Sequence, residues 1–460
     1  MAKVLLVKAA GGPPYQITPP LGLLYVASAA RKAGHDVRFA DLRLKGGQKD
    51  MARLIKNFRP DVVGISAVYP EMGFLWETAG EVKRQTRGRA LVVAGGPCAS
   101  TAPEEVLSRP DMDFALVGEG EETFPALLDA VDQGFTPKDL PGLAFRWKEK
   151  VRANPAPDFM ENLDVLPRPA WDLVDFSRYE KALRTHMLKP RRYAAVMTSR
   201  GCPFGCIYCH KILGKKFRPR SPQNVVDEME HLVARYGVQE IEVWDDVFNV
   251  DAKRAEKICD LIIERRLNVR LSMPTNVRAD IMPPRLLRKM KDAGLYYMGI
   301  AVETGSPEKQ KLLGRNFSLE KARQTMELAR KLSITTTGFF MLGLPGETAE
   351  EMEQTISFAC QSPLNFATFN TLRPYPNTVL WDMCGQEVHG KDPKKLLYVN
   401  TSDNLSSLPD KEYARVVRSA IRRFYARGFD RILLSGAFRH ISLGAAAKEY
   451  LLRITPGQRF

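Results

Sequence analysis

The sequence has no apolar run that approaches the roughly 20 residues needed to cross a bilayer. We expect no signal peptide either, because the first residues, MAKVLLVKAAGG, predict a buried strand. Cysteine is scarce: seven in 460 residues do not make a disulfide framework, and three of them lie within eight positions. We therefore expect a folded protein of the cytoplasm, a reducing compartment, whose crowded cysteines hold a metal.

Acidic residues are too few to balance the basic ones. The chain has 68 Lys and Arg against 53 Asp and Glu, a net charge of +15, and residues 411–460 hold eleven basic and three acidic residues. In a helix there, Arg415, Arg418 and Arg422 would share one face. We expect that face to be solvated, or to dock on an anionic membrane surface or a lipid-like substrate. Interleaved aromatic residues are too few to indicate a nucleic-acid site.

Residues 1–135 alternate short β-branched runs with helix-like stretches. This alternation is typical of a parallel sheet with helices on both faces, the doubly wound α/β fold. Ligands of such sheets bind beyond the carboxyl ends of the strands, where several glycines of this region cluster. Five buried strands are expected, at Lys3–Val7, Val37–Ala40, Val62–Ser66, Ala90–Ala94 and Phe114–Val117.

Residues 136–190 lose this alternation and gain prolines, so we expect a linker between domains with one hairpin near Leu143–Val151. The alternation resumes over residues 191–385 and predicts a partial, TIM-like (βα)6 barrel with its site at the carboxyl ends of the strands. Residues 386–460 are expected to be mainly helical. The barrel strands are predicted near Ala194–Thr198, Ile241–Trp244, Val269–Met273, Tyr297–Val302, Thr335–Met341 and Phe366–Leu372.

Cys202, Cys206 and Cys209 follow the first predicted barrel strand, so we expect them on a loop at the active end. Thiolates are soft ligands that suit iron–sulfur clusters, and three of them can hold three irons of a cubane cluster while the fourth iron stays open. Two alternatives remain. One is a structural zinc site with His210 as a fourth ligand, and the other is a chance group of buried thiols.

The cysteine spacing, with Tyr208 before the last cysteine, resembles the signature of the radical S-adenosylmethionine (SAM) superfamily. The resemblance implies that the open iron binds the amino and carboxylate groups of SAM, and that one electron from the [4Fe–4S] cluster releases a 5′-deoxyadenosyl radical. Arg278, which the resemblance assigns to SAM binding, could instead form an ordinary surface ion pair with Asp280. The resemblance extends to Trp244–Phe248, Asn276–Asp280, Ala301–Ser306 and Gly338–Glu347. The implied SAM-binding residues are Tyr208, Asp245, Asp246, Arg278, Glu303, Ser306, Gly338 and Leu342.

The first 130 residues resemble the cobalamin-binding domain that precedes the barrel in one large class of radical SAM enzymes. Glycines at strand ends let backbone groups approach a large flat corrin and its phosphate-bearing tail. The resemblance rests on Pro19–Leu23, Ala33–Val37, Val63–Ser66, Gly95–Pro97 and Val117–Glu121. The implied cobalamin-binding residues are Leu21, Gly22, Ser66, Tyr69, Gly95, Gly96, Gly118, Glu119 and Gly120. The alternative is a similar sheet that no longer binds the cofactor.

The Asp-x-His-x-x-Gly signature, whose histidine binds cobalt in other cobalamin enzymes, is absent. His35 precedes a predicted strand in a helix–strand turn, where we expect a solvated or capping histidine. The lower cobalt face should therefore lack a histidine ligand, and Tyr69 or its neighbours are expected to cover it.

Together the two resemblances imply a cobalamin-dependent radical SAM enzyme that methylates an unactivated carbon of a small-molecule or lipid-like substrate. They also imply an external one-electron donor of the flavodoxin or ferredoxin type. We expect substrate contacts from residues 373–410, including Arg373, Tyr375 and Asn377.

Three other functions remain open. An oxidative cyclase or rearrangement enzyme, like the anaerobic cyclases of porphyrin esters, would use the same cofactors without methyl transfer. A methylthiotransferase would need a second set of cluster cysteines, whereas the other four cysteines are widely scattered along the chain. A non-catalytic cobalamin or metal sensor would not need the intact triplet.

Overall fold

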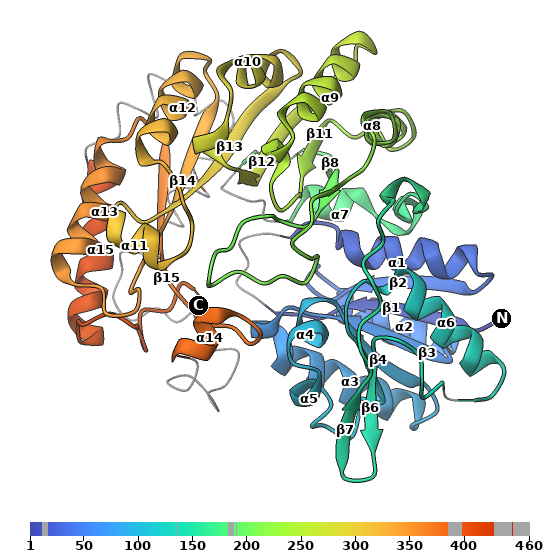
Figure 1. The fold of residues 1–460 in the computed structure, drawn as a ribbon. Helices are drawn as coiled ribbons and strands as arrows, with labels where there is room; N and C mark the ends of the chain where they lie inside the picture. The colour runs from blue at the N-terminus through green and yellow to red at the C-terminus, as the bar shows by residue number, and fades with distance from the viewer. Residues whose placement is uncertain are drawn as a thin grey trace.

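The protein consists of two α/β units that lie side by side, the first coloured blue to teal and the second green to orange in Figure 1. Among the residues described here, no helix is long and apolar enough to cross a membrane. Of the predicted helical carboxyl-terminal region, residues 398–426 and 444 are described: α15 (Asp410–Ala426) is a helix, whereas residues 398–409 before it are not helical. The computed structural model describes residues 1–11, 17–135, 137–182, 188–189, 191–384, 398–426 and 444.

A seven-stranded sheet in the order β2-β1-β3-β4-β5-β6-β7 forms the amino-terminal unit. Its first five strands are parallel, and each predicted strand is present to within one residue at either end. The bounds of β1 to β5 are Lys3–Lys8, Asp36–Asp41, Val62–Ser66, Leu91–Gly95 and Phe114–Leu116.

Helices cover both faces of this sheet, which is why its strands are almost entirely apolar. Leu6 of β1 packs on the face that carries α1 and α6, and the adjacent Leu5 packs on the face that carries α2 and α3. This arrangement confirms the doubly wound fold. The helices are α1 (Leu21–Lys32), α2 (Gly47–Phe58), α3 (Met72–Thr86), α4 (Gly96–Thr101), α5 (Pro103–Val106) and α6 (Gly120–Asp132).

The predicted hairpin extends the amino-terminal sheet instead of lying in the linker. Its strands are β6 (Leu143–Trp147) and β7 (Lys150–Ala153), and β6 pairs antiparallel with β5. Leu143 and Ala144 are fully buried in the sheet. The prolines on either side of the hairpin gave no sign of this pairing, because they mark turns and not the partner of a strand. The segment that follows contains α7 (Phe176–Glu180).

The second unit is a six-stranded sheet in the order β8-β11-β12-β13-β14-β15, with every pair parallel. Since β8 and β15 are its two edges, it is the predicted partial barrel, with helices on its outer face (Figure 1). Its strands are Tyr193–Val196, Glu240–Val243, Arg270–Val277, Leu295–Glu303, Thr335–Leu342 and Phe366–Thr371. The helices are α8 (Pro222–Tyr236), α9 (Ala252–Glu264), α10 (Pro284–Asp292), α11 (Pro307–Leu312), α12 (Leu319–Lys331), α13 (Ala349–Gln361) and α14 (Val379–Cys384).

Helix α15 lies against β15 and α13 at the far edge of the barrel. On this helix, Tyr413, Ala420 and Phe424 are buried, whereas Arg415 and Arg422 are exposed. The described part of the predicted basic helix therefore has an apolar inner face and a basic outer face.

Candidate functional site

The carboxyl ends of the amino-terminal strands face the start of the barrel across a cavity of about 450 Å³. The first unit supplies one wall, from α1, from the carboxyl ends of β1, β3, β4 and β5, and from the loops after β2, β3, β4 and β5. The barrel supplies the other wall, and Figure 1 shows its green loop after β8 lying between the two units. The barrel residues that line the cavity are Met197, Arg200, Ile212, Leu213 and Trp244.

Eight of the nine predicted cobalamin-binding residues line this cavity. A Cβ added at Gly22 or Gly95 would meet nothing within 4 Å, so the backbone there borders open space. At Gly96, where φ is 78°, a Cβ would lie 2.6 Å from Ser66 Oγ. Glycines in the wall let a large cofactor approach the backbone closely, so these residues fit cobalamin. The eight are Leu21, Gly22, Ser66, Gly95, Gly96, Gly118, Glu119 and Gly120.

Tyr69, the ninth, is not among the residues that line the cavity. It lies in a 3₁₀ turn after β3, where its hydroxyl donates to Glu105 Oε2 at 2.9 Å. Its ring packs edge-on against Tyr375 and Trp381 of the second unit. Tyr69 therefore contributes to the contact between the units, and no contact places it over a corrin face.

His35 is buried rather than solvated. Its Nδ1 accepts from the backbone N–H of Ala2 at 3.3 Å, and its Nε2 lies 3.2 Å from Asp129 Oδ1. It immediately precedes β2, at the amino end of the sheet and opposite the cavity. The expectation that His35 is no cobalt ligand agrees with this position. Of the two predicted roles, the residue caps α1, since its backbone N–H donates to the carbonyl oxygen of Ala30 at 3.1 Å, but its side chain is buried and not solvated.

Two cavity-lining cations were missed at the sequence level. Lys8 ends β1 and pairs with Glu71, and Arg43 pairs with Asp41 at 2.6 Å. Burial lowers the pKa of Lys8, although Glu71 opposes the shift. A lysine that directly follows a buried apolar strand is the signal that could have revealed this position, because the carboxyl ends of the strands were already expected to bind the ligand.

The cysteine triplet lies on residues 201–217, the cluster loop. Its base is closed by β9 (Ser199–Arg200) and β10 (Arg218–Pro219), which pair antiparallel. The structure describes all seven cysteines, and none of them forms a disulfide. Burial, together with the nearby thiols of Cys206 and Cys202, raises the pKa of Cys209 to about 12, so the three sulfurs are neighbours.

Three neighbouring thiols on one loop fit an iron–sulfur cluster, in which each thiolate binds its own iron. No three His, Cys, Asp or Glu side chains are placed to hold a single metal ion within the described part of the chain. His210, the possible zinc ligand, instead stacks on Tyr375 with 5.8 Å between the ring centroids. The other cysteines are buried in three separate hydrophobic clusters, Cys98 in one, Cys259 and Cys360 in another, and Cys384 in a third.

Asp245 and Asp246, predicted to bind SAM, hold the start of the cluster loop. Asp245 is buried and accepts from the backbone N–H of Thr198 at 2.5 Å and from Ser199 Oγ at 2.6 Å. Asp246 accepts from the N–H of Gly201 at 3.0 Å. Asp246 is exposed, so it is the one of the two that a bound ligand can reach.

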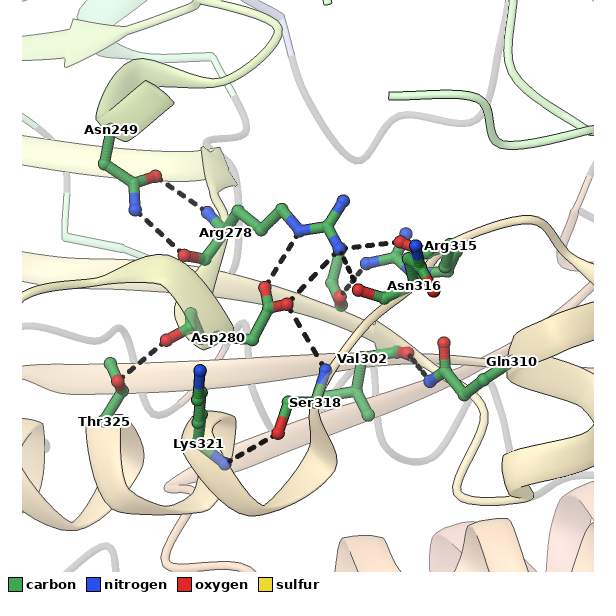
Figure 2. Close-up of polar contacts among 12 residues, drawn as sticks. Asn249, Arg278, Asp280, Val302, Gln310, Arg315, Asn316, Ser318, Lys321 and Thr325 are labelled. Atoms are coloured by element: carbon green, nitrogen blue, oxygen red, sulfur yellow. Dashed lines mark hydrogen bonds and ion pairs between the residues drawn. The ribbon is translucent and has the colours of Figure 1, made fainter. Parts of the chain in front are cut away.

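Arg278 is not a surface residue, and its Nε and Nη2 are engaged by other protein groups. Its Nε donates to Asp280 Oδ1 at 2.9 Å, and its Nη2 donates to the carbonyl oxygens of Arg315 and Asn316 at 2.6 and 2.8 Å, as Figure 2 shows. Both partners of the ion pair are buried. The guanidinium also lies over the ring of Phe204 in the cluster loop, 3.7 Å from its centroid. Arg278 therefore packs beneath the cluster loop and fixes it to the loop around Arg315.

Tyr208 and Glu303, two predicted SAM ligands, meet at a buried arginine that no sequence pattern had singled out. The Tyr208 hydroxyl donates to Glu303 Oε1 at 3.1 Å and accepts from Arg315 Nη1 at 2.6 Å. Arg315 Nη2 donates to the carbonyl oxygen of Ala301 at 2.6 Å. Burial raises the pKa of Glu303, and Arg315 opposes the shift. Because Tyr208 adjoins Cys209, this network ties the cluster loop to the end of β13.

The last three predicted SAM residues face protein. Ser306 caps α11 by accepting from the N–H of Lys309 at 3.4 Å. A Cβ on Gly338 would lie 2.5 Å from Leu364 Cδ1, so its open side is filled by the core. Leu342 is fully buried.

Of the predicted substrate residues, Arg373 is buried and donates to the carbonyl oxygens of Asn400, Ser402 and Asp403 at 2.7, 2.7 and 2.9 Å. It holds the segment that precedes α15. Tyr375 lies beside the cluster loop through its stack on His210, and Asn377 is exposed.

Both units match known families. Residues 196–359 match the radical SAM superfamily, and residues 7–128 match the B12 binding domain. An uncharacterized methyltransferase of Pyrococcus horikoshii is 32% identical over 428 residues, 92% of this chain and 90% of that protein. The anaerobic magnesium-protoporphyrin IX monomethyl ester cyclase of Rubrivivax gelatinosus is 28% identical over 88% of this chain and 74% of its own length.

Among solved structures, the radical S-adenosylmethionine methyltransferase TsrM from Kitasatospora setae, with cobalamin and a [4Fe–4S] cluster bound, has a similar fold. The TM-score is 0.70 at 22% identity, over 85% of this chain and 79% of that one. The two proteins therefore share the fold over most of both chains.

Proposed function

This chain belongs to the cobalamin-binding radical SAM enzymes, and from that membership we propose that it methylates an unactivated carbon of a small-molecule or lipid-like substrate. Its cofactors are SAM, a [4Fe–4S] cluster and cobalamin. When bound, the cluster and SAM supply a radical that takes a hydrogen atom from the substrate, and cobalamin supplies the methyl group.

One observation carries the proposal: the cavity and the cluster loop share a wall. Ile212 and Leu213 of the loop line the same cavity as Gly95 and Gly118 of the amino-terminal unit. A methyl donor in the cavity would therefore lie next to the site where the substrate radical forms. Proximity of this kind is what a transfer between two cofactor sites requires.

The chain's own residues would hold and shield these groups. Cys202, Cys206 and Cys209 would bind the cluster, while Arg278 and Arg315 keep the loop in place from below. The apolar residues Ile212 and Leu213 would exclude water between the two sites, which protects a reactive radical from side reactions.

The test is an anaerobic assay of the reconstituted protein with SAM labelled in its methyl group. We expect label in the product together with 5′-deoxyadenosine. Deoxyadenosine without methyl incorporation would contradict methyl transfer but keep the radical chemistry. No SAM cleavage under reducing conditions would contradict an enzyme and favour the sensor.

An oxidative cyclase is the second candidate, because a cyclase is 28% identical over most of this chain. Methyl transfer is preferred since a protein named as a methyltransferase is 32% identical over 92% of it. The labelled-SAM assay separates the two, because a cyclase would give an unlabelled product.

The cluster also needs an electron, and a flavodoxin or ferredoxin type of donor fits a cofactor of low potential. Replacement of a chemical reductant by such a protein should sustain SAM cleavage. Seven cysteines without a disulfide suit a reducing compartment, so the cytoplasm is the proposed location.

The exposed basic face of α15 supports contact with an anionic membrane that presents a lipid-like substrate. Arg415 and Arg422 are exposed on that face. Flotation with anionic vesicles is expected for the native chain and not for a variant carrying both Arg415→Glu and Arg422→Glu. Equal flotation of both proteins would contradict the contact and leave the face merely solvated.

A further inference from the structure

The ribbon at the base of the cluster loop brings two like charges together. Arg200 of β9 is the register partner of Arg218 of β10, and both side chains are buried, with Arg200 5% and Arg218 2% exposed. Two guanidiniums in a low-dielectric interior repel one another strongly unless anions lie beside them. The ribbon therefore depends on carboxylates from elsewhere in the chain.

Those carboxylates come from the amino-terminal unit. Glu119 Oε1 accepts from Arg200 Nη1 at 2.9 Å and from Arg218 Nη2 at 2.8 Å, and its Oε2 accepts from Arg218 Nη1 at 3.1 Å. Glu121 accepts from the other Nη of Arg200. Glu119 is the N-cap residue of α6, yet its side chain makes no capping hydrogen bond. The carboxylate serves the second unit and not its own helix.

The same short segment is also part of the cavity wall. Gly118, Glu119 and Gly120 all line the cavity, and so does Arg200. Glu119 was predicted to bind cobalamin, but both of its oxygens are engaged by the arginines and by the N–H of Met160 at 3.0 Å. A ligand in the cavity therefore touches the backbone of residues 118–120, and the one carboxylate of this segment, that of Glu119, holds the base of the cluster loop.

We propose that Glu119 is a positioning residue through which the cavity and the cluster loop stabilise one another. Cobalamin in the cavity favours the position of residues 118–120 that neutralises Arg200 and Arg218, and an ordered ribbon favours the same position. The inference rests on the cofactors of the proposed function but not on methyl transfer. Because linkage is reciprocal, each cofactor must raise the affinity for the other by the same factor.

The experiment compares the affinity for hydroxocobalamin, followed by optical titration under anaerobic conditions, in the full chain with and without its reconstituted cluster. For the native chain we expect the cluster to raise corrin affinity about five- to tenfold, within the range of ordinary coupling between sites. Glu119→Gln keeps the shape of the side chain but removes its charge. For this variant we expect the ratio of the corrin affinities with and without the cluster to be near one. Glu122→Gln is the matched control, since Glu122 lies in the first turn of α6 and is exposed.

If the ion pair were merely structural, its loss would lower the corrin affinity equally in the chain with and without its cluster. The ratio of the two affinities would then stay unchanged, so this ratio distinguishes coupling from a structural role. A native-like ratio in Glu119→Gln, or a ratio of one in the native chain, would overturn the inference. If Glu119→Gln shows no cooperative unfolding transition and is therefore not folded, the same affinity ratio is measured in Arg218→Lys. This variant keeps the charge but loses the two-point contact with Glu119. A native chain that binds no corrin in either state would contradict the cofactor assignment as well, whereas methyl transfer without coupling would remove this inference alone.

Discussion

The two cofactor sites differ in what builds them. In the amino-terminal site, the backbone of glycines at strand ends forms part of the wall, and eight of the nine predicted residues line the cavity. The cluster side is built from charged side chains, and Asp245, Arg278 and Glu303 are each engaged by other protein groups. A backbone site can be located from the order of strands and glycines. A side-chain site depends on partners that only the folded chain brings together.

The largest expected effect comes from Cys206→Ala, which removes one thiolate of the cluster loop. Iron should fall from about four per chain to near zero, and SAM cleavage should stop, because two thiolates do not retain a cubane cluster. The cavity should remain, with hydroxocobalamin bound at the weaker affinity of the cluster-free chain. Metal counting and optical spectra measure both. Cys360→Ala, in the barrel core, is the control and should keep its iron.

Gly22→Leu should damage the other site selectively. The helix α1 accepts leucine well, and the new side chain would enter the space that lies open beside Gly22. We expect corrin affinity to fall about 100-fold or more, which corresponds to roughly 3 kcal/mol, while iron content is unchanged. Lys32→Leu, exposed at the end of the same helix, should bind corrin normally. Normal corrin binding by Gly22→Leu would show that the cofactor does not reach this glycine.

Arg278→Lys tests whether this arginine positions the loop or binds SAM. Lysine cannot make the paired contacts with Asp280 and the two loop carbonyls, so cluster content and SAM cleavage should fall about tenfold. The dissociation constant for SAM of the cluster-loaded fraction should stay unchanged. A selective loss of SAM affinity at full iron content would instead assign Arg278 to the ligand. The control is Arg265→Lys, which alters a surface pair with Asp227.

The smallest effect concerns Glu347, which accepts from the N–H groups of Gly343 and Leu344 after β14. Burial raises its pKa from 4.5 to about 7. Its contribution to stability is therefore fully present below pH 4.5 and is lost as the pH rises to about 7. The loss is at most about 3 kcal/mol. Glu347→Gln should reduce the difference in Tm between pH 5 and pH 8. Glu350→Gln, on the exposed start of α13, is the control and should leave this difference unchanged. An unchanged difference in Glu347→Gln would refute the raised pKa of Glu347.

Much of the fold was predictable because hydrophobic period and strand length are local properties. The five parallel strands of the first unit agree to within a residue, and Phe114–Leu116 shows why: an apolar run between turn signals needs no distant information. Pairing is not local, which is why the hairpin at Leu143 was left out of the sheet. The same limit applied to His35, because its own turn does not reveal that the side chain is buried against Ala2, 33 positions away in the sequence.

Within the site, the thiols were identifiable from spacing alone, whereas their supports were not. Arg315 acts on Tyr208 from more than 100 positions away, and nothing in its own neighbourhood indicates that role. Glu119 lines the cavity, as expected for a cobalamin-binding residue, but its side chain has a second role that the sequence did not indicate. Its place beside two glycines indicated the cavity correctly, but its carboxylate is committed to arginines about 80 and 100 positions later.

Tyr69 packs against Tyr375 and Trp381, with ring centroids 6.1 and 6.4 Å apart, just after the last barrel strand. Glu119 holds the chain near the first barrel strand. The first unit thus contacts the barrel near both of its ends, and linker residues such as Trp171 also pack between the two units. A protease cut in the exposed stretch near Ala156 should leave two fragments that migrate as one particle. Two separately expressed polypeptides, divided there, should assemble into the same enzyme.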